Sequence, residues 1–76
     1  MIIYIGPELE GITRANQIFN YEPEAIKAAA EKVEPLSRYL FVDLDNIVSA
    51  KKELHTKGSL LFLAYEKTIK TISKEE

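Results

Sequence analysis

The sequence contains no cysteine and only one histidine, His55, among its 76 residues. Without cysteine the chain can form neither a disulfide framework nor a thiolate metal site. His55 stands near the expected end of a helix, beside Thr56 and Lys57, where a cation is favourable to the helix dipole. Its sequence neighbours do not complete a catalytic triad or a metal site. We therefore expect no enzyme activity, no catalytic or metal-binding residues and no cofactor.

Long apolar runs are also missing. No stretch approaches the roughly 20 consecutive apolar residues of a membrane helix. The N-terminal segment MIIYIGPELE lacks the basic region and the long apolar core of a signal peptide. We therefore expect a soluble, cytoplasmic protein without a membrane partner.

Length and composition indicate one small domain over residues 1–76. An apolar fraction of 46% with a net charge of −2 is typical of a globular chain. A chain of 76 residues buries only about 60–65% of the surface that it exposes when unfolded, so its stability is modest. We expect residues 73–76 to be frayed.

The longest apolar run lies in the segment SLLFLAYEKTIKTI, which we predict to be the last helix. Gly58 suits the left-handed residue that ends one helix, and Ser59 can cap the next. One face of this helix is formed by Leu61, Ala64, Tyr65, Thr68, Ile69 and Ile72. The first turns are apolar nearly all round, so we expect protein to surround their other side, formed by Leu60, Phe62 and Leu63. A buried strand over residues 60–65 is the alternative.

Two further helices are indicated. Pro23, flanked by acids, starts a helix over residues 23–33 that Pro35 ends. Asp43 or Asp45 can cap a second helix that stops before Gly58. The apolar side of this second helix carries Leu44, Ile47, Val48 and Leu54.

Three short segments favour strands, namely residues 2–5, 17–19 and 40–42, with a tight turn at residues 36–38 before the third. The elements follow one another as strand, strand, helix, strand, helix, helix. This order predicts a small α+β domain with a three-stranded sheet covered by helices on one face.

The segment from Gly6 to Thr13 follows a strand and has the glycine spacing and final threonine of a phosphate-binding loop. The position that requires lysine holds Ile12 instead, and Glu8 and Glu10 would repel a phosphate. We therefore interpret this segment as a turn.

The segment LFVDLD, residues 40–45, resembles the strand and paired aspartates of the haloacid dehalogenase family of phosphotransferases. The resemblance implies that Asp43 is a nucleophile and Asp45 a general acid/base. However, too few residues follow to build the rest of that fold. The spacing also suits a pair of metal-binding carboxylates, but no glycine turn or later glutamate completes a calcium loop. We interpret these aspartates as helix caps.

Charges are unevenly distributed along the chain. Residues 1–48 contain eight acids and four bases, a net charge of −4, whereas residues 49–74 contain six lysines and two glutamates, a net charge of +4. We predict a basic face formed by Lys51, Lys52, Lys67, Lys70 and Lys74. Opposed charges can orient copies head to tail, although lysines near helix C-termini are also what helix electrostatics alone favours. Because this segment lacks arginine and the chain is acidic overall, we do not expect a nucleic-acid partner.

The whole chain resembles small uncharacterised proteins from phages and prophages of Gram-positive bacteria. The resembling segments are residues 4–7 (YIGP), residues 40–42 (LFV) and residues 56–59 (TKGS). The resemblance implies a part of the virion or of its assembly machinery, in the host cell or the virion, without a small-molecule substrate.

Two functions remain open from the sequence. The first is a structural or assembly protein that acts as a homo-oligomer or with another phage protein. It predicts an exposed apolar strip, for which the candidates are Tyr4, Phe19, Tyr21 and Tyr39. The second is a monomeric binding module that uses its lysine-rich helices on an acidic protein or nucleic acid, with binding that weakens steeply in salt.

Overall fold

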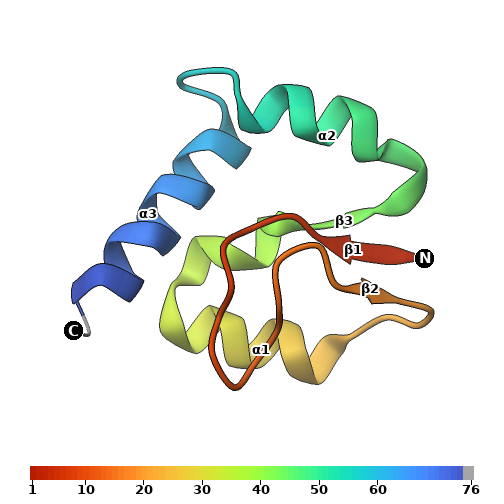
Figure 1. Ribbon diagram of the computed structural model, residues 1–76, viewed down its shortest axis with the longest axis horizontal. Coiled ribbons are helices and arrows are strands. Elements are labelled where there is room, and N and C mark those ends of the chain that lie inside the picture. The colour runs from red at the N-terminus through yellow and green to blue at the C-terminus, as the bar shows by residue number, and fades with distance from the viewer. Residues whose placement is uncertain (75–76) are drawn as a thin grey trace.

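The computed structural model describes the backbone of residues 1–74 and the side chains of residues 1–73. Three strands form one antiparallel sheet in the order β2-β1-β3 (Figure 1). The strands are β1 (Ile2–Tyr4), β2 (Ile18–Phe19) and β3 (Phe41–Asp43). The helices are α1 (Glu24–Val33), the 3₁₀ helix η1 (Pro35–Leu40), the 3₁₀ helix η2 (Leu44–Asn46), α2 (Ile47–Leu54) and α3 (Leu60–Lys74). The predicted α+β class is confirmed, and η1 takes the place of the predicted tight turn.

Aromatic side chains fill one face of the sheet. Ile2 pairs with Phe19, and Tyr4 pairs with Phe41, so these side chains point to the same side. The ring centroids of Tyr4 and Phe41 are 4.8 Å apart, and those of Phe19 and Phe41 are 6.1 Å apart. The sheet therefore contributes a compact aromatic cluster to the core.

The buried hydroxyl of Tyr4 has a hydrogen-bond partner within the fold. It donates to the Pro7 carbonyl oxygen at 2.7 Å, as a buried tyrosine hydroxyl normally requires. Burial, with a smaller contribution from Tyr65, raises the pKa of Tyr4 well above its usual value. Tyr4 therefore stays neutral throughout the physiological pH range.

The 3₁₀ helix η1 lies at the centre of the molecule, packed against both α1 and α3. Its Ser37 and Leu40 side chains are fully buried. The facing side of α3 contains the buried residues Ala64 and Thr68, and the Thr68 hydroxyl donates to the Ala64 carbonyl at 2.8 Å. A bond inside the helix thus satisfies this polar side chain within the core.

The start of α3 follows the prediction. Gly58 has a φ of +91°, and the Ser59 hydroxyl accepts a hydrogen bond from the Phe62 amide at 3.1 Å. The alternative of a strand over residues 60–65 is therefore wrong. The helix includes Ser73 and Lys74, and the rest of the terminus predicted to fray, residues 75–76, lies outside the described residues.

The expectation that protein surrounds the first turns of α3 is wrong. Leu60 is 48% exposed and Leu63 is 47% exposed. A helix places successive residues about 100° apart, so Leu63 lies about 200° from the buried Leu61, across the helix, and Leu60 lies at the edge of the buried face, in the first turn. In so small a domain η1 and α2 cover one side of α3, and the opposite side faces solvent.

No helix within residues 1–74 combines the length and the apolar character that a membrane crossing requires.

Candidate protein-binding surface

The helices α2 and α3 pack against each other at the edge of the molecule (Figure 1), and a surface groove lies beside their contact. Its deeper part is a hollow of about 300 Å³ lined by Leu54, His55, Phe62, Tyr65 and Glu66. A shallower part runs along α2 and is lined by Val48, Lys51, Lys52, His55 and Thr56. His55 borders both hollows, and we call the two together the α2–α3 groove.

The α2–α3 groove has an apolar floor. Leu54, Phe62 and Tyr65 are half-buried, so part of each side chain remains open to solvent. Val48 is 72% exposed, the largest exposure among the large apolar side chains of the described residues. The prediction that Val48 shares the buried side of its helix is wrong. Val48 lies about 200° around the helix from the buried Ala50, which marks the side that packs inward.

Lysines lie on the α2 side of the groove. Lys51 and Lys52 are exposed on α2 and line the shallow part of the groove. Among residues 1–73, the ion pairs join Lys27 to Glu22 and Arg38 to Glu31, and none includes a lysine from residues 49–73. The positive charge beside the groove is thus available to an acidic partner.

The predicted basic face is divided between two places. Lys67 and Lys70 lie on α3, where they line a separate hollow with Glu34 and Thr71. They share the exposed side of α3 with Leu60 and Leu63. The side chain of Lys74 lies outside the described residues. The structure therefore brings Lys51 and Lys52 together at the groove but does not place Lys67 and Lys70 there.

The four aromatic candidates for an exposed strip also separate into two pairs. Tyr4 and Phe19 are buried, and their prediction as interface residues is wrong, because the strand pairing turns both toward the core. Tyr21 and Tyr39 are 58% and 45% exposed. The Tyr21 ring stands edge-on against Phe19, with 5.9 Å between the ring centroids, so the core supports it from beneath.

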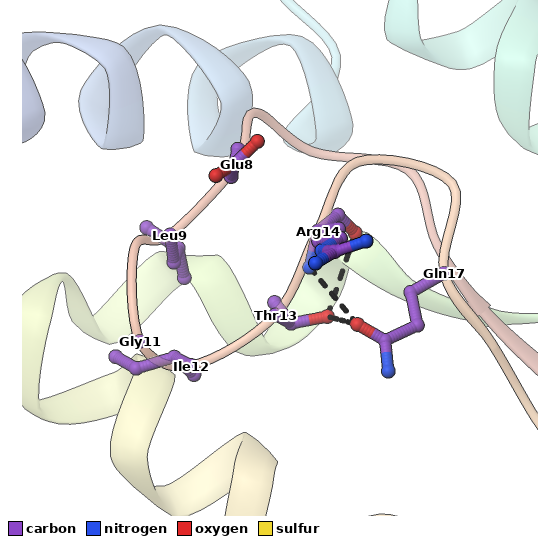
Figure 2. A pocket seen from close by; sticks show the side chains of 7 residues that line it. All are labelled: Glu8, Leu9, Gly11, Ile12, Thr13, Arg14 and Gln17. Carbon is purple, nitrogen blue, oxygen red and sulfur yellow. Dashed lines mark hydrogen bonds between the residues drawn. The ribbon is translucent and has the colours of Figure 1, made fainter.

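The glycine-containing segment that follows β1 forms a hydrogen-bonded turn, as predicted. The amide nitrogen of Leu9 donates to the Thr13 carbonyl at 2.9 Å, and Gly11 has a φ of +81°. Figure 2 shows the Gln17 side-chain oxygen bridging the Thr13 hydroxyl, at 3.1 Å, and the Arg14 amide, at 3.0 Å. A hollow of about 310 Å³ beside this turn is lined by Glu8, Leu9, Gly11, Ile12, Thr13, Arg14 and Gln17. The Thr13 hydroxyl and the Gln17 side-chain oxygen thus bond within the turn.

Asp43 acts as a cap. Its side chain accepts a hydrogen bond from the Asp45 amide at 3.0 Å, at the start of the helical turn that leads into α2. Both aspartates are exposed. Within the described part of the chain, no three histidine, cysteine or acidic residues gather in a way that would hold a metal ion.

In comparisons with known proteins, the chain matches no protein-family model, and no curated protein or solved structure is similar to it. A functional proposal for this chain therefore depends on the geometry of its surfaces.

Sequence reasoning missed Val48 and Phe62 as parts of a binding surface because it assigned every large apolar side chain of the two helices to the core. The signal for Val48 was present in the sequence. Ala50 lies on the opposite side of a short helix, and an alanine permits the close approach that an inner face requires. No comparable local signal distinguishes Phe62, since its exposure depends on how α2 crosses α3.

Proposed function

We propose that this protein is a non-enzymatic interaction module that binds an acidic, partly apolar protein surface in the α2–α3 groove. The observation that supports this most directly is the exposed Val48 in the shallow part of the groove, where Lys51 and Lys52 line the same hollow. Interfaces combine an apolar centre with a polar rim, and complementary charge orients the partners.

The resemblance to small phage proteins supports a biological setting for this module. We propose an accessory role in virion assembly, in which the partner is another copy of the chain or another phage protein. A monomeric module that binds an acidic host protein is the second candidate, which the lysine border of the groove also favours.

A synthetic amphipathic helical peptide tests the binding surface. The probe carries leucine and tyrosine on one face and glutamate on the other, and nuclear magnetic resonance shifts of the labelled protein report where it binds. We expect shifts centred on the α2–α3 groove that diminish at high salt. Val48→Glu should weaken binding at least tenfold because it places an acid beside the acidic probe.

A matched variant separates the groove from the exposed side of α3. Leu63→Glu introduces the same charge at another exposed aliphatic residue and should retain most of the binding. Equal losses from the two variants would contradict the assignment of binding to the groove. A peptide that binds equally well at low and high salt would contradict the role of the lysine border.

A further inference from the structure

One end of the molecule is acidic and carries an exposed aromatic side chain. Figure 1 places the N-terminus, the loop between β2 and α1, and η2 together, away from the last turns of α3. The sheet explains this proximity, because Ile2 pairs with Phe19 on one side and with Asp43 on the other. We define the acidic end as the exposed residues Met1, Tyr21, Glu22, Glu24, Asp43 and Asp45.

Tyr21 has the properties of an interface anchor. Its ring is 58% exposed yet held edge-on against Phe19, so little side-chain freedom would be lost when a partner covers it. Tyrosine is enriched in the centres of protein interfaces. An exposed tyrosine supported by the core is therefore suited to insertion into a hollow on another surface.

The deeper part of the α2–α3 groove offers such a hollow. Its volume of about 300 Å³ lies at the lower limit of the roughly 300–1,000 Å³ of small-molecule sites. Its floor of Leu54, Phe62 and Tyr65 is apolar. A hollow of this size and lining suits one aromatic side chain better than a cofactor.

The charges of the two surfaces are opposite in sign. The acidic end has four carboxylates, one of which, on Glu22, is paired with Lys27. The α-amino group of Met1 offsets another, so the net charge of this end remains negative. The groove is lined by two lysines, Lys51 and Lys52, and by one glutamate, Glu66, a net charge of +1. Exposed charges act over about 8 Å at physiological ionic strength, so they attract most strongly when the surfaces nearly touch. This attraction favours the acidic end, over other faces of the chain, as the surface that docks in the groove.

We infer that the acidic end of one copy docks in the α2–α3 groove of a second copy, with Tyr21 in the apolar hollow. This inference rests on the proposed function and names its partner as a second copy of the chain. The two surfaces differ, so the contact is heterologous and each bound copy still offers one free surface. Repeated contacts of this kind produce rings when they close and filaments when they do not.

Complementation between two blocked variants tests this arrangement. Tyr21→Lys blocks the acidic end by removing the ring that fills the hollow and placing a charged side chain against its apolar floor, and Val48→Glu blocks the groove. Light scattering on a sizing column should show concentration-dependent multimers for the original chain and at least a tenfold loss of self-affinity for either variant alone. An equimolar mixture should form a 1:1 dimer, because the intact groove of one variant accepts the intact acidic end of the other.

Tyr39→Lys is the matched control, since it makes the same change at an exposed tyrosine outside the acidic end. It should leave self-association unchanged, and circular dichroism verifies the fold of every variant. If the folded variants remain monomeric when mixed, the head-to-tail contact is wrong. If the original chain is monomeric at all concentrations but still binds the acidic peptide, this inference fails and the proposed function stands. Loss of peptide binding as well would overturn both.

Discussion

Gly6 lies just after β1, where its missing side chain leaves room for two core side chains. A Cβ atom at this position would lie 2.5 Å from Cδ1 of Leu40 and 2.6 Å from the hydroxyl oxygen of Tyr4. Neither neighbour can move easily, because both are fully buried and the Tyr4 hydroxyl is bonded to Pro7. This position therefore requires glycine, because no space remains for a side chain.

Gly6→Ala should therefore lower the free energy of unfolding by about 1–3 kcal/mol, the usual cost of overpacking a core. Urea unfolding followed by circular dichroism measures this change. Gly11→Ala is the control, since its φ is +81° but nothing lies within 4 Å of the added carbon. The control should lose only about 1 kcal/mol, from backbone strain. A cost for Gly6→Ala no larger than that of the control would show that the core can rearrange around the extra methyl group.

Single residues also show the limit of prediction from sequence. Tyr4, Phe19 and Tyr21 are all aromatic residues in or beside predicted strands, so the sequence does not distinguish them. In the structure the first two are buried and the third is exposed. Tyr4 and Phe19 lie in paired strands and point to the core face of the sheet, whereas Tyr21 follows the end of β2 and lies outside the sheet. The register depends on which strands pair, and that pairing joins segments distant in the chain.

At the scale of elements, α3 is the clearest success of local reasoning. The sequence indicates that Gly58 follows the end of one helix and that Ser59 caps the next. The structure has both features. The cap satisfies one of the amides that the first turn of a helix leaves without a partner. Its contribution is local, so it is predictable without knowledge of the rest of the fold.

Ser59→Ala should lower the free energy of unfolding by about 1 kcal/mol, because the Phe62 amide loses its partner. The control is Ser49→Ala, which removes the same hydroxyl from an exposed position inside α2. That variant should be neutral or slightly more stable, since alanine has the higher helix propensity. Thermal unfolding of the two variants side by side makes the comparison, and equal melting temperatures would argue against a stabilising cap.

At the scale of the whole molecule, one core connects the sheet, η1 and α3. Leu40 is fully buried at this junction, and its carbonyl accepts a hydrogen bond from the Ile5 amide at 2.9 Å. Proteins have roughly 0.05–0.15 kcal/mol of stability per residue, so a chain of this length has little in reserve. Loss of one central side chain should therefore affect every element together.

Leu40→Ala should lower the free energy of unfolding by about 2–5 kcal/mol, from lost burial and the cavity that remains. Leu63→Ala removes the same atoms from an exposed position on α3 and should change stability by less than about 0.5 kcal/mol. Circular dichroism and tyrosine fluorescence should report one shared transition for each variant. Separate transitions would mean that α3 unfolds independently of the sheet.

The sequence by itself determined the α+β class, the order of the elements and the ends of the main helices. These features depend on signals within a few residues, such as Pro35 after α1 and the glycine–serine pair before α3, because helix ends are governed by backbone geometry and nearby amides. Short runs of strand-favouring residues bounded by turn signals were also sufficient to identify the strands.

Only the tertiary structure decided which apolar side chains remain exposed. Val48 and Leu63 are aliphatic residues of the kind that usually lies in a core. However, a domain of 76 residues has too few elements to cover every side of its helices. The α2–α3 groove likewise exists because α2 crosses α3 and brings Leu54 beside Phe62 and Tyr65. Burial results from contacts between distant segments, and for that reason the candidate binding surface emerged from the fold and not from any local pattern.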